Sequence, residues 1–168
     1  MFEFRNLRKV FHQWGGATTA FFVYTHASHD LCGALLMALL PLIKASLGLS
    51  YLQAALLLSA YSITSGISQF LGGWLSDRVD RRIVIAIGLG GVGLFSMAIG
   101  LSPTYYAMLA VLVIMGIFAG AYHPSATPIL SGNFEETRRG KVLGLHLVGG
   151  SMGFVVGPVL GGLIAGML

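Results

Sequence analysis

The stretch GWLSDRVDRR, residues 73–82, decides the fold because it is a short charged island between two long apolar runs. The flanking runs, residues 52–71 and 83–101, contain no charged side chain. Each run is about 20 residues long, and at a rise of about 1.5 Å per residue this length spans a hydrocarbon core about 30 Å thick. The island is therefore predicted to be a tight loop that joins two membrane-spanning helices.

The composition indicates an all-α integral membrane protein. Hydrophobic residues make up 55% of the chain, charged residues only 10%, and the mean hydropathy is +0.81. A soluble domain carries about 25% charged residues. The apolar stretches are too long for barrel strands and do not alternate. We predict one membrane domain, residues 1–168, with an interfacial amphipathic helix at 1–15 and five spans at about 19–43, 50–71, 82–101, 103–130 and 141–167.

The orientation follows from the Lys and Arg residues near the span ends. Nine fall on one side of the predicted membrane, and Lys44 alone falls on the other. Positive charge is retained on the cytoplasmic side. We therefore expect a multi-pass protein of the cell inner (plasma) membrane with a cytoplasmic amino terminus. A disordered tail is the alternative to the amphipathic helix at residues 1–15.

The charged loop carries a motif whose spacing is similar to the signature between the second and third helices of the major facilitator superfamily of transporters. Its residues are Gly73, Leu75, Asp77, Arg78, Arg81 and Arg82. Glycine allows a close helix approach, an aspartate is favoured at helix amino termini, and arginines hold the loop at anionic headgroups. The family has a glycine where this chain has Asp80. The alternative is a basic loop that merely follows the charge rule.

A second motif lies in the last span, in the run GFVVGPVLGG at residues 153–162. Glycines recur every four residues and form a ridge almost free of side chains, and the proline permits a bend. The motif resembles the glycine-proline signature of proton-driven drug exporters in the same superfamily. The residues assigned to it are Gly153, Gly157, Pro158, Gly161 and Gly162.

A third resemblance, to fosmidomycin resistance proteins, rests on HASHD at residues 26–30, PLIK at 41–44 and AYHPSA at 121–126. It implies the amino-terminal part of a twelve-span exporter that moves a small drug-like molecule against protons. The implied partners are the lipid bilayer, the substrate, protons, and a missing carboxyl-terminal half or a second copy. A fourth-helix arginine common in proton-coupled exporters would fall near Leu112, so that role cannot be transferred.

Ionisable residues at membrane depth are the candidate coupling residues: Asp30, His123 and His26. Such groups are costly in lipid and are usually functional. A neutral His26 that bonds to Asp30 and only joins helices is the structural alternative. His146 is expected to reach headgroup water, and His29 to lie about a quarter-turn off the face shared by His26 and Asp30.

Other classes of function are less consistent with the sequence. The run GGSMG at residues 149–153 fits the Gly-x-Ser-x-Gly pattern and leaves an intramembrane serine protease as a remote alternative. The longer glycine-proline pattern accounts for the same residues and more. We expect no enzyme activity, no metal, no cofactor and no nucleic-acid partner. A non-transporting membrane module or truncated fragment is the main alternative to a transporter.

Overall fold

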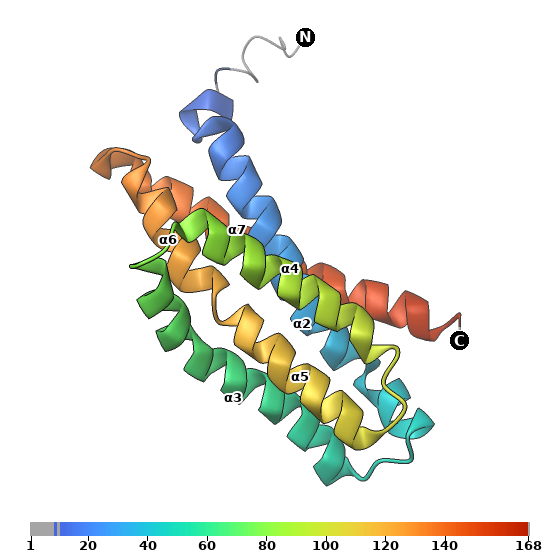
Figure 1. Ribbon diagram of the computed structural model, residues 1–168. Coiled ribbons are helices and arrows are strands. Elements are labelled where there is room, and N and C mark those ends of the chain that lie inside the picture. Colours follow the sequence, from blue (N-terminus) through green and yellow to red (C-terminus); the bar gives the residue numbers. More distant parts are fainter. Residues whose placement is uncertain (1–8, 10, 168) are drawn as a thin grey trace, which may run out of the picture.

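A computed structural model describes residue 9 and residues 11–167 of the chain, and in these residues the structure is helical without any strand (Figure 1). The helices are α2 (Gly16–Ser46), α3 (Tyr51–Ser76), α4 (Arg81–Ile99), α5 (Tyr105–Ala119), α6 (Tyr122–Gly132) and α7 (Glu136–Ala165). Most of the predicted amphipathic helix lies outside the described residues. Residues 11–13 are helical, and the chain then turns at Gly15, whose φ of 93° is in the left-handed region that favours glycine.

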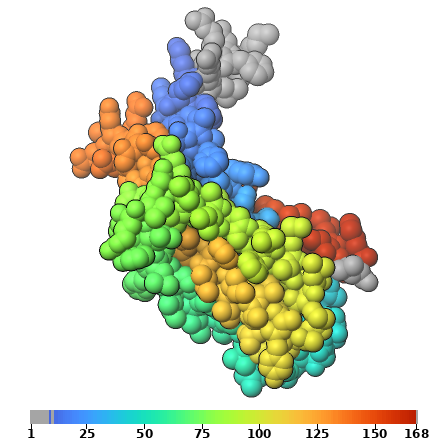
Figure 2. Space-filling model, viewed as in Figure 1, coloured from blue at the N-terminus to red at the C-terminus, as the bar shows by residue number. Residues whose placement is uncertain are grey.

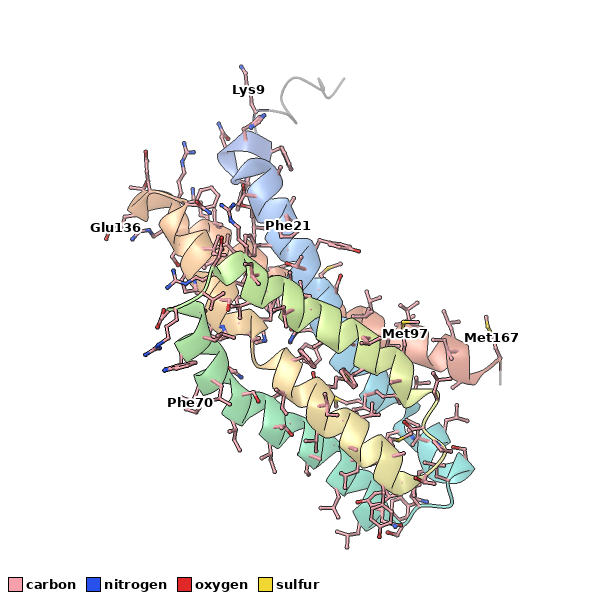
Figure 3. The ribbon with its side chains drawn as sticks, in the orientation of Figure 1. Lys9, Phe21, Phe70, Met97, Glu136 and Met167 are labelled. Atoms are coloured by element: carbon pink, nitrogen blue, oxygen red, sulfur yellow. The ribbon has the colours of Figure 1, made fainter. Side chains whose placement is uncertain are left out.

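Five apolar helical segments are long enough to cross a membrane, with α5 and α6 together forming one of them. The prediction of five membrane-spanning helices in an all-α protein is therefore confirmed. Large apolar side chains point outward from several helices, as Figure 3 shows for Phe70 and Met97, whose exposed fractions are 82% and 76%. Such side chains match a hydrocarbon solvent and would be unusual on a soluble protein of this size.

The helix ends follow local sequence signals. Ser50 and Gln53 form a capping box at the start of α3, and the Thr104 side chain caps α5. Asp80 caps α4 by accepting a hydrogen bond from the backbone N–H of Arg82 at 2.9 Å. The family glycine at this position is thus replaced by a residue that stabilises the amino terminus of α4.

The predicted span 103–130 is divided into two helices. Residues 120 and 121 form a turn between α5 and α6, and Pro124 follows in the first turn of α6. Proline has no backbone N–H, and its ring crowds the carbonyl of the residue four positions earlier, here Gly120. The break frees backbone groups at the end of α5 for bonds to other helices.

The helices pack mainly in three pairs, α2 with α7, α3 with α5, and α4 with α5. Figure 1 shows α3, α5 and α4 side by side, with α7 passing behind α4 and α2. Glycine permits the close approaches: a Cβ at Gly116 would lie 2.7 Å from the Tyr61 carbonyl oxygen, and a Cβ at Gly72 would lie 2.7 Å from that of Gly120. Figure 2 shows the elongated bundle that results.

Candidate functional site

Polar side chains from three helices, most of them buried, meet where α2 crosses α6 and α7. We call this group the polar cluster; its members are Thr25, His26, His29 and Asp30 of α2, Tyr122 and His123 of α6, and His146 of α7. Residues 26 and 30 share a helix face because they are four apart. The turn after α5 brings the start of α6 over this face, and the pairing of α2 with α7 adds His146.

Asp30 lies at the centre of the cluster, and its side chain is only 12% exposed. Its Oδ1 lies 2.8 Å from Nδ1 of His29, and its Oδ2 lies 3.3 Å from Nε2 of His26. Nε2 of His123 is 4.0 Å from Oδ1. The side chain of His123 is 37% exposed, so it forms the open side of the cluster. A carboxylate surrounded by imidazoles brings together groups that can each accept and release a proton.

The far nitrogens of the histidine rings bind backbone carbonyls of neighbouring helices. Nδ1 of His26 donates to the His146 carbonyl at 2.7 Å, and Nε2 of His29 donates to the Ala119 carbonyl at 3.1 Å. Nδ1 of His146 donates to the Phe22 carbonyl at 3.1 Å. Each ring is therefore held in orientation from two sides.

Aromatic stacking completes the enclosure. The rings of His26 and His146 stack with centroids 4.2 Å apart, and those of His29 and Tyr122 stack at 5.0 Å. The hydroxyls of Thr25 and Tyr122 lie 2.8 Å apart and are hydrogen-bonded to each other, and both lie within 3.3 Å of the Phe22 carbonyl oxygen. Most of the cluster is buried and His123 is its most exposed member, and a low local dielectric strengthens the electrostatic interactions of Asp30.

The sequence identified only part of this cluster. Asp30, His26 and His123 are brought together, whereas His29, expected off the shared face, makes the shortest contact with Asp30. The expectation that His146 reaches headgroup water is wrong, since this residue is 3% exposed and stacks on His26. The pairing of α2 with α7 accounts for the difference.

Donor atoms of His26, Asp30 and His123 all lie within 4.8 Å of one another, so the three residues also have the chemistry of a metal site. His123 comes from α6, so these donor atoms meet only because α6 packs on α2. That no metal binds stays a prediction.

The glycine ridge of α7 faces α2. Added Cβ atoms at Gly149 and Gly153 would collide with the backbone of residues 23 and 27, and one at Gly157 would lie 2.5 Å from Cβ of Ala34. Gly161 continues this contact at Ala38. Gly162 meets nothing within 4 Å, and Pro158 lies on the exposed side of α7. Ser151 is exposed and donates to the Leu147 carbonyl.

Gly150, next to the glycine ridge on α7, lies against the polar cluster. A Cβ at this position would lie 2.6 Å from both Oδ2 of Asp30 and Nε2 of His26. The absence of a side chain here leaves the space that the two polar groups occupy.

The charged loop is organised by its own side chains. Asp77 accepts a hydrogen bond from Nη2 of Arg81 at 3.0 Å, which joins the end of α3 to the start of α4. The Arg78 guanidinium lies over the Trp74 ring at 4.2 Å. A Cβ at Gly73 would lie 3.6 Å from Cβ of Pro124, which is an ordinary van der Waals contact. Gly72 rather than Gly73 therefore provides the close approach to α5 and α6.

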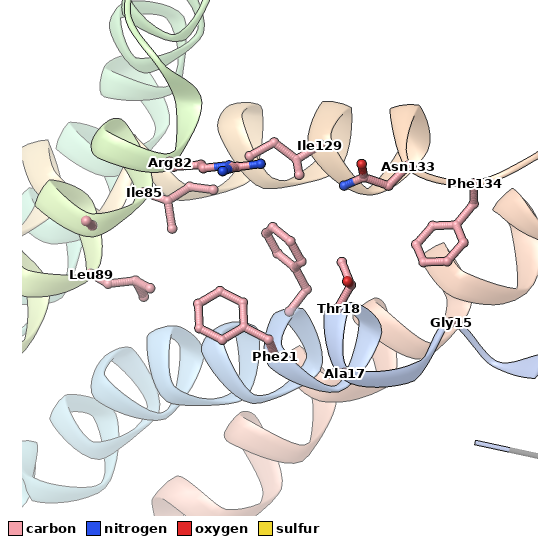
Figure 4. Close-up of a pocket in the computed structure, with 12 residues that line it drawn as sticks. Gly15, Ala17, Thr18, Phe21, Arg82, Ile85, Leu89, Ile129, Asn133 and Phe134 are labelled. Carbon is pink, nitrogen blue, oxygen red and sulfur yellow. The ribbon is translucent and has the colours of Figure 1, made fainter. Parts of the chain in front are cut away.

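A groove of about 730 Å³ lies beside the polar cluster, between α2, α4 and α6 (Figure 4). Figure 4 shows apolar side chains, among them Phe21 and Ile85, below and beside the polar groups of Arg82 and Asn133. Phe22 also lines the groove, and its carbonyl accepts hydrogen bonds from the cluster. The groove and the cluster therefore share the wall formed by residue 22.

Comparison with known proteins identifies relatives over most of the chain. The puromycin resistance protein pur8 of Streptomyces alboniger is 31% identical over 80% of this chain and 27% of its own length. The multidrug resistance protein MdtG of Yersinia enterocolitica is 31% identical over 79% of this chain and 33% of its own length. The hexuronate transporter of Bacillus subtilis is 30% identical over 72% of the chain and 29% of its own length.

The chain thus spans about a quarter to a third of the length of these relatives. They are transporters and resistance proteins rather than enzymes, in agreement with the sequence prediction, and the protease alternative is set aside. The family described as Major Facilitator Superfamily matches residues 20–168. The chain therefore belongs to the major facilitator superfamily of membrane transporters.

Proposed function

We propose that this chain is part of a proton-coupled antiporter that exports a small drug-like molecule across the plasma membrane. The observation that carries the proposal is the buried carboxyl of Asp30 held between His26 and His29, with the half-exposed His123 beside it. Burying an ionisable group at membrane depth costs free energy that a purely structural helix contact would avoid. The names of two relatives, for puromycin and multidrug resistance, support a drug as substrate.

The substrate class remains part of this proposal. The resemblance of residues 26–30, 41–44 and 121–126 to fosmidomycin resistance proteins makes fosmidomycin the first compound to test, with puromycin as the second. Export of neither compound by a complete transporter, together with export of a sugar acid, would favour a substrate like that named for the hexuronate transporter.

The chain is proposed to act as one membrane domain that works with further helices, supplied by a carboxyl-terminal half or by a second copy. The length of the relatives supports this proposal. Transporters of this family bind substrate between two helical halves, so a cluster on one half needs the other to enclose a site. If the chain transports nothing when combined with a carboxyl-terminal half or with a second copy, it is a non-transporting membrane module instead.

The proposed orientation places the amino terminus and the charged loop in the cytoplasm, because nine of ten Lys and Arg residues fall on that side. Cysteines introduced one at a time in a Cys32→Ala background report the side of each loop. Val79, 40% exposed in the charged loop, and Leu101, 84% exposed between α4 and α5, are suitable positions. Ser76 is unsuitable because it is buried.

An impermeant thiol reagent added to intact cells is expected to label Leu101→Cys and to leave Val79→Cys unlabelled until the membrane is permeabilised. The reverse pattern would invert the orientation.

Gly150→Ala is expected to impair transport without unfolding the protein. The added methyl group would lie 2.6 Å from both Asp30 and His26, and these side-chain ends can move away where backbone could not. We expect a loss of about tenfold in the export rate, corresponding to one disturbed hydrogen bond to a charged group. Gly144→Ala on the same helix meets nothing within 4 Å and is the matched control. Equal export rates for the two variants would show that Gly150 is not part of the transport site.

A further inference from the structure

Backbone carbonyls determine where two ring protons of the polar cluster lie. A carbonyl oxygen only accepts hydrogen bonds. Nδ1 of His26 must therefore carry the hydrogen that binds the His146 carbonyl, and Nε2 of His29 must carry the hydrogen that binds the Ala119 carbonyl. In a neutral imidazole the other nitrogen has no hydrogen and acts as an acceptor.

These other nitrogens are the ones that face Asp30. Nδ1 of His29 and Oδ1 of Asp30 lie 2.8 Å apart, the distance of a hydrogen bond. Two acceptors without a hydrogen between them repel at this distance. One proton must therefore lie between His29 and Asp30, on the imidazole or on the carboxyl group, in addition to the proton that His29 donates to Ala119.

Several titratable groups surround this proton. His26 and His29 of α2 and His123 of α6 lie against Asp30. Tyr122 stacks on His29, His146 of α7 stacks on His26, and Tyr61 of α3 lies beside Gly33, one turn along α2. Among the described residues, the ion-pair partners of Asp30 are histidines, with no lysine or arginine. The charge that balances Asp30 is thus removable, unlike that of an arginine.

We propose that His29 is a positioning residue that links the proton held with Asp30 to the junction between α5 and α6. When the proton leaves, His29 has one ring hydrogen for two acceptors, the Asp30 carboxylate and the Ala119 carbonyl. The charged carboxylate is the stronger acceptor of the two, so the bond to the Ala119 carbonyl is the one released. The inference rests on the proposed function, in which Asp30 is the coupling residue. It adds how the protonation state of Asp30 changes the junction between α5 and α6.

The position of Ala119 gives this route a mechanical consequence. Ala119 is the last residue of α5, and residues 120 and 121 form the turn before α6. The bond from His29 is therefore made at the point where the helix is already interrupted. Its loss would loosen the turn that positions Tyr122 and His123 over the cluster.

Hydrogen–deuterium exchange of the chain in lipid nanodiscs tests this inference without any transport measurement. After correction for the intrinsic pH effect, amide exchange at residues 120–122 is expected to rise about tenfold as pH increases and the shared proton is lost, since one strong hydrogen bond is released. Failure of the transport proposal would leave this result unchanged, so the two can fail separately.

Two substitutions each retain one of the two hydrogen bonds of His29. Gln has a terminal amide that reaches as far as Nε2, so His29→Gln keeps a donor for Ala119 at every pH. Asn reaches only as far as Nδ1, so His29→Asn keeps a donor for Asp30 alone. We expect slow exchange at residues 120–122 in His29→Gln and fast exchange in His29→Asn, both without the pH-dependent rise.

His12→Gln, which changes an exposed histidine outside the cluster, should retain the rise. Protection of buried Leu112 in α5 shows that each variant is folded. Should a His29 variant fail this check, Asp30→Asn replaces it, because its amide donates to His29 permanently and should also remove the rise. A wild-type chain without the rise, or a folded His29→Gln variant that keeps it, would overturn the inference.

Discussion

Asp30→Asn is expected to abolish export driven by a proton gradient while the protein folds normally. The asparagine amide can donate to Nδ1 of His29 as a protonated carboxyl group does, so the 2.8 Å contact is preserved. The amide does not titrate, however, and no proton can be exchanged at this position. In inside-out vesicles with an acidic lumen, gradient-driven drug accumulation should fall to the level of vesicles without transporter.

The assay requires a complete transporter that contains this chain. Glu136→Gln is a matched control because Glu136 is an exposed carboxyl in the first turn of α7, outside both the polar cluster and the motif of the charged loop. His123→Ala should alter the pH dependence or the substrate preference, because its side chain forms the open side of the cluster. Gradient-driven export at the wild-type rate by both Asp30→Asn and His123→Ala would reduce the cluster to a structural contact.

Gly153→Leu is expected to cause a large loss of stability. Even a Cβ at this position would collide with the carbonyl of Ala27 and lie 2.9 Å from the backbone nitrogen of Leu31. Backbone cannot move aside as a side chain does, so α7 must shift away from α2. We expect a loss of about 3 kcal/mol in the free energy of unfolding, at the upper end of overpacking effects.

Gly144→Leu is the control for helix propensity and hydrophobicity, because Gly144 is exposed on the same helix and meets nothing within 4 Å. Its effect should stay within about 0.5 kcal/mol, as for most surface changes. Unfolding in detergent, followed by circular dichroism, compares the two variants. Similar stability for both would mean that α7 does not depend on its contact with α2.

The helices were predictable because the physical signal for each is local. A run of about 20 apolar residues predicts a membrane span by itself, and the charged loop marks its end. The shared face of His26 and Asp30 also follows from helical spacing alone. The break after Ala119 was missed because residues 103–130 remain apolar on both sides, although Pro124 was the available signal.

The cluster could be predicted only in part because its remaining contacts join distant segments. His146 reaches His26 through the packing of α7 on α2, which depends on where Gly149 and Gly153 remove side chains. The ridge was visible in the sequence, but the helix that it faces was not. The role of His29 depends on the carbonyl of Ala119, which becomes available only because α5 ends there.

Substrate-induced proton release is the measurement that tests the central claim most directly, namely that the Asp30 cluster exchanges its proton for substrate. Drug is added to the purified, complete transporter in weakly buffered detergent solution, and a pH-sensitive dye reports the protons released. The account predicts release by the wild type and by Glu136→Gln, and none by Asp30→Asn. Release by Asp30→Asn equal to that of the wild type would contradict it.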